Sequence, residues 1–165
     1  MLSVALLSPA PLVRASSSGH ESLQERVWSL PEEDLIIFSP EQPRFEITVF
    51  TDVNCPFCRE LHRHIEDFVI WEIKIRYAAF PTIGNAREQM EAVWCSKDRH
   101  DAMTRAKRGE IVEAQACENP VADHLDLALS AGFLGTPAIV TPAGQVLYGR
   151  TSPASLVAVL EREDR

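Results

Sequence analysis

Two cysteines, Cys55 and Cys58, stand at the junction of two different hydrophobic patterns (CPFC). Before them, residues 45–52 (FEITVFTD) form a short apolar run rich in β-branched side chains, which predicts a strand. After them, residues 56–68 carry apolar side chains three to four positions apart, which predicts a helix. The pair therefore lies in a tight turn between strand and helix. Pro56 takes a first helical position, where a missing N–H costs nothing.

This position gives the two thiols different expected roles. Cys55, at the start of the helix, meets unpaired backbone N–H groups and the positive end of the helix dipole. Both stabilise a thiolate, and cysteines placed in this way have pKa values lowered from roughly 8.5 into the range of about 3.5–7.5. We therefore predict that Cys55 is the nucleophile and that Cys58, one turn on, resolves the mixed disulfide. A structural disulfide or half of a zinc site are the alternatives for such a pair.

Composition limits the remaining function classes. The chain has 165 residues, 45% of them hydrophobic, which suits one globular domain. A formal net charge of −8, without any block of Lys or Arg, argues against nucleic acid as a partner. No apolar stretch approaches the roughly 18–20 residues needed to cross a bilayer, so we expect no membrane span in the mature fold.

The first nineteen residues differ in character from the rest. Residues 1–19 begin with a run of small and apolar side chains, followed by a polar stretch, and Val13 and Ala15 occupy the positions that signal peptidase inspects. We expect a secretory signal peptide here, although no basic residue precedes the run; a disordered apolar tail is the alternative. Residues 20–34 are mixed and charged, and the spacing of Leu23, Val27 and Leu30 predicts one or two helical turns.

The region around the cysteines reads as an α/β unit. Residues 35–38 predict a short strand, and the proline-containing turn at 39–43 predicts a hairpin with the strand at 45–52. Residues 73–80 alternate apolar and charged side chains and predict a further strand. Since this strand follows the helix after Cys55, a right-handed βαβ unit with parallel strands is the simplest arrangement.

The second half of the chain begins with a largely helical segment. We interpret residues 85–132 as three helices inserted between two halves of a sheet. Residues 138–141 and 145–148 then predict two strands joined by a turn, which is a hairpin. The apolar residues of 153–163 predict a final helix that packs on the sheet.

Cys95 and Cys117 both lie in the helical insertion, 22 positions apart. In an oxidising compartment we expect them to form a structural disulfide, worth about 3 kcal/mol in the chain-entropy model. Two reduced buried thiols are one alternative. A metal site shared with Cys55 and Cys58 is another, but it lacks a second close pair of ligands and would consume the nucleophile.

Thr136 and Pro137 open the late apolar strand. A proline cannot donate to a sheet ladder, so Pro137 belongs at a strand start or edge. Only about 5–6% of X-Pro bonds in folded proteins are cis, and on composition alone trans is the default.

These features together resemble the thioredoxin fold, with a helical insertion between the βαβ and ββα halves. The region from Leu35 to Leu160 is similar to the catalytic domain of the DsbC/DsbG family of bacterial periplasmic disulfide isomerases. The matching stretches are ITVFTDVNCPFCRELH (47–62), IRYAAFP (75–81), AVWCSKD (92–98) and ADHLDLALSAGFLGTPAIV (122–140). The resemblance covers most of the chain, and we take residues 35–165 as the catalytic domain.

The resemblance carries expectations about the site. It implies that Pro137 is cis and faces the Cys55–Cys58 pair, that the Thr136 backbone helps to hold a substrate strand, and that Cys95 and Cys117 are joined. It also implies a periplasmic thiol:disulfide oxidoreductase of the isomerase or reductase type that needs no cofactor and no metal. Its expected partners are protein substrates with disulfides and a membrane thiol reductase or oxidase.

The similarity also leaves two rival functions open. Members of the family dimerise through an N-terminal domain and a linker helix, and residues 20–34 match at most the end of that linker. A monomeric dithiol oxidase is therefore one alternative. A thioredoxin-fold module that binds a metal or docks a partner without exchange chemistry is the other.

Several polar side chains near the cysteines need an interpretation. Arg59 and His62 follow the nucleophile on its helix, where we favour a solvated face over a role in thiolate formation. Glu46 and Asp52 are carboxylates that either relay protons near the resolving thiol or lie on the surface. Two other histidines, without ligand spacing, are assigned no role: His100 and His124.

Overall fold

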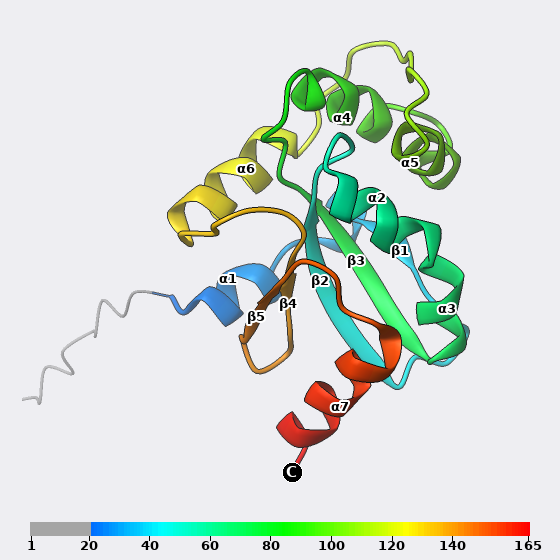
Figure 1. The fold of residues 1–165 in the computed structure, drawn as a ribbon. Coiled ribbons are helices and arrows are strands. Elements are labelled where there is room, and N and C mark those ends of the chain that lie inside the picture. The colour runs from blue at the N-terminus through cyan, green and yellow to red at the C-terminus, as the bar shows by residue number, and fades with distance from the viewer. Residues whose placement is uncertain (1–20) are drawn as a thin grey trace, which may run out of the picture.

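The computed structural model describes residues 21–165, and its centre is a five-stranded mixed sheet with helices on both faces (Figure 1). The predicted signal peptide lies outside the described residues. The elements are α1 (Leu23–Trp28), the 3-10 helix η1 (Glu32–Asp34), β1 (Ile36–Phe38), β2 (Phe45–Thr51), α2 (Pro56–Arg63), α3 (Ile65–Ile70), β3 (Ile73–Ala79), α4 (Ala86–Trp94), α5 (Arg99–Lys107), α6 (Val121–Ser130), β4 (Ala138–Val140), β5 (Val146–Tyr148) and α7 (Pro153–Glu163). Between residues 21 and 165, no helix has the length and apolar character that crossing a bilayer requires.

The strands follow the order β1-β3-β2-β4-β5. β2 and β3 are parallel over their whole length, from Phe45 opposite Ile73 to Thr51 opposite Ala79. β4 is antiparallel to β2, and β5 is antiparallel to β4. The predicted βαβ unit, the late hairpin and the α/β fold class are therefore confirmed.

The predicted hairpin between β1 and β2 is wrong. β1 pairs antiparallel with β3, with Ile36 opposite Tyr77. β2 has no free edge for β1, because β3 occupies one side of it and β4 the other. The two prolines between β1 and β2, Pro40 and Pro43, mark a change of direction in the chain, but they do not indicate which strand accepts the next edge.

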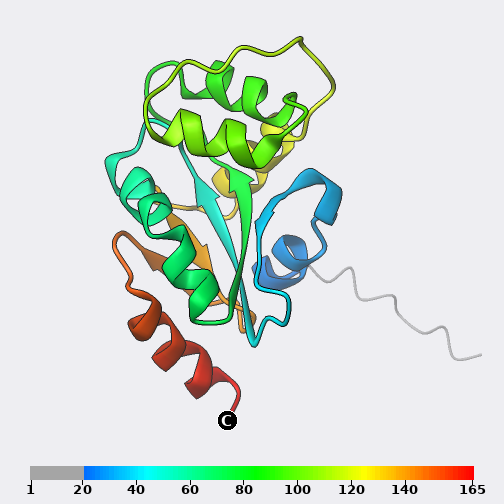
Figure 2. The same ribbon diagram turned by 90° about the vertical axis from the view of Figure 1, so that its right-hand side faces the viewer.

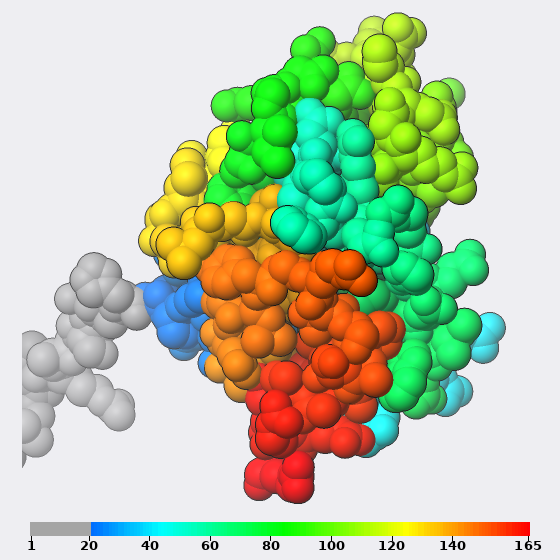
Figure 3. Space-filling model, in the orientation of Figure 1, coloured from blue at the N-terminus to red at the C-terminus, as the bar shows by residue number. Residues whose placement is uncertain are grey.

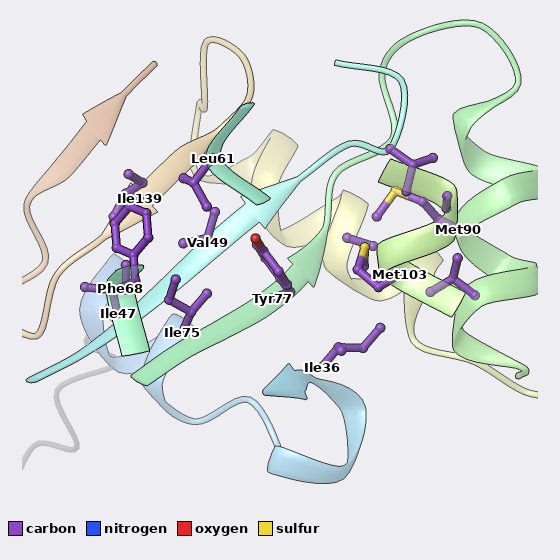
Figure 4. Close-up of a cluster of buried hydrophobic side chains, with 14 of the residues drawn as sticks. Ile36, Ile47, Val49, Leu61, Phe68, Ile75, Tyr77, Met90, Met103 and Ile139 are labelled. Carbon is purple, nitrogen blue, oxygen red and sulfur yellow. The ribbon is translucent and has the colours of Figure 1, made fainter. Parts of the chain in front are cut away.

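The two faces of the sheet carry separate apolar clusters. Side chains of β2 that point to one face pack against α2, α3 and α7, and Figure 4 shows Val49, Leu61, Phe68 and Ile139 gathered there. The other face, which includes Phe50, is covered by α1 and α6 (Figure 2). Both faces of β2 are largely buried, although three of its residues are polar: Glu46, Thr48 and Thr51.

The helix predicted over residues 56–68 is divided in two. α2 ends at Arg63 and α3 begins at Ile65, with His64 between them at φ −105° and ψ 20°. Apolar residues stay three to four positions apart across the break, and Phe68 in α3 is only 2% exposed. Periodicity therefore identified the buried face of this segment but gave no sign of the interruption.

The helical insertion packs over the end of the sheet where β2 and β3 finish (Figures 1 and 2). A disulfide joins Cys95, which follows α4, to Cys117, which precedes α6, so the predicted pairing is confirmed. Closing a loop of this length contributes about 3 kcal/mol in the chain-entropy model. Since both sulfurs are bonded to each other, they do not serve as metal ligands.

Candidate functional site

Cys55 caps the amino terminus of α2. It has extended backbone angles (φ −73°, ψ 123°), and Pro56 opens the helix directly after it. The backbone N–H groups of Phe57 and Cys58, in the first turn of the helix, help to lower the pKa of Cys55. The placement predicted from the sequence is confirmed, since the first turn of α2 offers its unpaired donors to this side chain.

The loop before β4 lies directly against this cysteine. The Thr136–Pro137 bond is cis, as the family resemblance implied. The Cys55 sulfur lies 3.2 Å from the Thr136 carbonyl oxygen. Figure 3 shows the surface of the start of α2 (cyan) beside the surface of the loop that precedes β4 (amber). Residues 81 positions apart in the chain thus form one site.

Both thiols of the pair are free and nearly enclosed. Cys55 is 4% exposed and Cys58 is 1% exposed. A hydrogen bond from the Cys58 thiol lowers the pKa of Cys55 to about 5, against the opposing effect of burial, and the Thr136 side chain and the backbone N–H groups add to the lowering. Burial, together with the same hydrogen bond, raises the pKa of Cys58. At neutral pH the reduced pair is therefore one thiolate, Cys55, with one thiol that donates to it.

The two carboxylates considered for proton relay differ in position. Asp52 is fully buried, and its carboxylate accepts hydrogen bonds from the backbone N–H groups of Asn54 at 2.7 Å, Thr82 at 2.6 Å and Ile83 at 2.9 Å. It ties the turn before Cys55 to the loop after β3. Glu46 begins the same strand at its far end, where it pairs with Lys74 at 2.9 Å.

The prediction of a solvated helix face is wrong for His62. This side chain is 5% exposed; its Nδ1 lies 3.2 Å from the Tyr77 hydroxyl and its Nε2 lies 3.0 Å from Thr104 Oγ1. Arg59 is held as well, because its Nε donates to the Val53 carbonyl oxygen at 2.7 Å. The physical reason is that α5 covers this face of α2, a contact that the periodicity of a single helix does not reveal.

Two buried histidines should make the folded protein less stable in acid. Burial, with the charges of Lys107 and Arg108, lowers the pKa of His62 to about 3, and burial lowers the pKa of His124 to about 4. Both stay neutral in the folded protein, whereas the unfolded chain binds protons below about pH 6.5. The free energy of unfolding should therefore fall as the pH drops from about 6.5 towards 4, by about 2 kcal/mol per histidine at pH 5. Urea unfolding of the oxidised protein at pH 7 and pH 5 measures this.

A matched pair of variants isolates the contribution of His124. Its Nδ1 accepts a hydrogen bond from the Ala79 N–H at 3.1 Å, and an asparagine amide oxygen can take that place. His124→Asn should remove about half of the acid-induced loss. His64→Asn should leave that loss unchanged, because the His64 side chain is 57% exposed. Equal acid sensitivity of His124→Asn and the wild type would contradict the assignment.

The sequence reasoning missed Lys107. This lysine ends α5 but is only 4% exposed, and its ammonium donates to Thr51 Oγ1 at 2.5 Å and to the Asp52 carbonyl oxygen at 2.9 Å. A signal was present, because Lys107 follows the buried Met103 by four positions and so belongs to the apolar face of its helix. Over residues 21–165, no group of three His, Cys, Asp or Glu side chains lies close enough to hold a metal ion.

Comparison with proteins of known sequence and structure supports the resemblance. The thiol:disulfide interchange protein DsbC of Salmonella typhimurium is 35% identical over 137 residues, which cover 81% of this chain and 58% of that protein. DsbC of Haemophilus influenzae is 33% identical over 133 residues, covering 79% and 58% respectively. The chain thus spans less than two thirds of the length of these curated relatives.

The solved structures agree with the fold. A disulfide interchange protein from Neisseria gonorrhoeae superimposes with a TM-score of 0.71 at 26% identity, over 82% of this chain and 99% of that chain. The family model described as a thioredoxin-like domain matches residues 31–163, which include the whole sheet, the cysteine pair and the cis-proline loop. The chain therefore belongs to the thioredoxin-like domain family.

Proposed function

We propose that this chain is a thiol:disulfide oxidoreductase that exchanges disulfides with protein substrates through Cys55 and Cys58. The observation that carries the proposal is the thiolate–thiol pair at the start of α2, set against the cis Thr136–Pro137 bond. A lowered pKa makes Cys55 a thiolate at neutral pH, and the thiolate is the form that attacks disulfides. The relatives named above are thiol:disulfide interchange proteins, which agrees with this chemistry.

The geometry supports a two-step reaction. The Cys55 thiolate attacks one sulfur of a substrate disulfide, which forms a mixed disulfide and releases the other substrate sulfur as a thiolate. Cys58 then attacks Cys55, forms the Cys55–Cys58 disulfide and releases the substrate as a dithiol. In the reverse direction the oxidised pair donates its disulfide. The backbone of Thr136 and Pro137, beside the attacking sulfur, is the proposed holder of an extended substrate segment.

A periplasmic location is the second part of the proposal. The Cys95–Cys117 disulfide supports an oxidising compartment, because structural disulfides are rare where cytosolic reductants act. In such a compartment a membrane thiol reductase or oxidase would return the pair to its working state. We place the enzyme with the isomerase and reductase types rather than with the oxidases, because its sequence resembles the catalytic domain of the DsbC/DsbG family.

Acid-quenched thiol trapping with a mass readout tests the function. The protein is equilibrated in a series of glutathione redox buffers, and the oxidation state of each cysteine is read separately. We expect Cys55 and Cys58 to titrate together between roughly −120 and −230 mV while Cys95 and Cys117 stay oxidised. A Cys55–Cys58 pair that resists reduction below about −300 mV would instead be a structural bridge. Thiols masked by bound metal would favour the docking module.

One further assay separates the types of exchange. The reduced protein is mixed with a scrambled protein that contains several wrong disulfides, without any other oxidant. Recovery of the native substrate shows isomerisation. Net loss of substrate disulfides shows reduction. In a parallel mixture, the oxidised protein is added to a reduced substrate, and activity in that mixture alone shows an oxidase.

A further inference from the structure

Lys107 is a buried cation without a neighbouring carboxylate. Within residues 21–165, no carboxylate oxygen lies within the 4.0 Å that defines an ion pair with its ammonium. Its two acceptors, Thr51 Oγ1 and the Asp52 carbonyl oxygen, are neutral. Removing an ammonium from water costs several kcal/mol unless a negative charge compensates. The charges of Asp52 and of the cysteine pair act on the ammonium only from beyond that distance, so a negative charge that forms nearby during function would stabilise it further.

Cys58 is the group on which such a charge forms. The Asp52 carbonyl oxygen that accepts from Lys107 also accepts from the Cys55 backbone N–H at 3.4 Å, so the ammonium lies at the turn that carries the cysteine pair. The positive charge of Lys107 and the hydroxyl of Thr51 both favour the thiolate form of Cys58, whereas burial opposes it. The three groups come from α5, β2 and α2, so the arrangement exists only in the folded domain.

We propose that Lys107, acting through and beside Thr51, is the positioning residue that stabilises negative charge on the Cys58 sulfur during disulfide exchange. This inference rests on the function proposed above. Each cysteine then has its own source of stabilisation. The start of α2 stabilises the Cys55 thiolate, and Lys107 of α5 stabilises negative charge on the buried Cys58.

The chemistry balances without an added oxidant. In the resolving step Cys58 gives its proton to solvent and attacks the Cys55 sulfur of the mixed disulfide. The Cys55–Cys58 bond forms, the bond between Cys55 and the substrate sulfur breaks, and the released substrate thiolate takes up a proton from solvent. In reverse, a thiolate attacks Cys55 and expels Cys58 as the leaving group. Lys107 keeps its proton throughout and faces the charged sulfur in both directions.

Other charged groups around Lys107 set its protonation. Burial, the largest cause, and the charge of Arg59 lower the pKa of Lys107 to about 8, while the charges of Cys58, Asp52 and Cys55 act in the opposite direction. From β3, the Tyr77 ring lies 5.7 Å from the ammonium. With this pKa the lysine is mainly protonated at pH 7, which the proposed role requires.

The test follows two rates in one reaction. Reduced protein is mixed with oxidised glutathione and quenched with acid at intervals, and mass spectrometry counts the Cys55–glutathione mixed disulfide and the Cys55–Cys58 disulfide. Lys107→Met keeps the length of the side chain but removes its charge. We expect formation of the mixed disulfide to change by less than about threefold and its resolution to slow by at least about tenfold, because losing one nearby opposite charge shifts a pKa by about one unit or more.

A control variant and a direct measurement distinguish the effect of the Lys107 charge from an effect of the substitution on the fold. Lys97→Met removes the same charge from an exposed position in the same insertion and should resolve at the wild-type rate. In a Cys55→Ala background, the pH profile of Cys58 alkylation should move up by at least about one unit on Lys107→Met. A purely structural role of Lys107 would not move that profile.

The possible results distinguish failure of this inference from failure of the proposed function. Resolution by Lys107→Met within twofold of the wild type overturns the inference and leaves the proposed function standing. A wild-type protein that forms no mixed disulfide with oxidised glutathione overturns the proposed function itself. If circular dichroism shows that Lys107→Met does not fold, Thr51→Val, which has the same shape, takes its place. Unchanged resolution in that variant also overturns the inference.

Discussion

Cys55→Ser should reduce thiol–disulfide exchange by at least about a hundredfold, to the background rate of the assay. The serine hydroxyl does not ionise at neutral pH, so the nucleophile is lost. Cys58 cannot replace it, because its pKa is raised and its side chain is 1% exposed. Reduction of a disulfide-containing protein such as insulin, followed by turbidity at pH 7, measures the effect.

Cys58→Ser is the matched control, since it makes the same chemical change three residues further on. It keeps the attacking thiolate and removes the resolving thiol, so a mixed disulfide with the substrate should accumulate and be visible on a non-reducing gel. In this variant the serine hydroxyl replaces the Cys58 thiol as the donor of the hydrogen bond to the Cys55 sulfur. If Cys55→Ser trapped the substrate and Cys58→Ser did not, the roles of the two cysteines would be reversed.

Trp94→Ala should lower the free energy of unfolding by about 3–5 kcal/mol, a large part of the stability of a domain of this size. The Trp94 side chain is fully buried at the end of α4. Its Nε1 donates to the Asp34 carbonyl oxygen at 2.7 Å, and its ring packs edge-on against His124 at a centroid distance of 6.0 Å. This one side chain thus connects α4 to η1 and to α6.

Trp71→Ala provides the comparison for that experiment. Trp71 follows α3 and is 48% exposed, so its loss should cost less than about 1 kcal/mol. Urea unfolding of both variants at pH 7, with the Cys95–Cys117 disulfide intact, gives the two free energies. Similar losses in the two variants would show that the insertion does not depend on the Trp94 contact for its stability.

Local patterns identified the elements that surround the cysteines. The β-branched run before Cys55 formed a strand and the apolar spacing after Cys58 formed helix, although that helix is interrupted at His64. The turn residues between β4 and β5 likewise predicted their hairpin. These patterns work because they depend on neighbours within one or two turns of chain.

Contacts between distant segments were not available from such patterns. The sequence could show that α5 has a buried face, but not that it would lie on α2 and enclose His62 and Lys107. In the same way, β1 has the composition of a strand, yet its partner depended on which sheet edges the rest of the fold left open.

The sequence by itself determined the two thiols, the strand and helix that present them, and the order of the elements along the chain. Only the tertiary structure decided that Thr136, 81 residues away, would lie against Cys55, and that a lysine from the insertion would lie against Thr51 and the Asp52 carbonyl oxygen, next to the cysteine turn. The physical reason is that hydrophobic periodicity reports which side of one element avoids water. The choice of what covers that side depends on the packing of the whole domain.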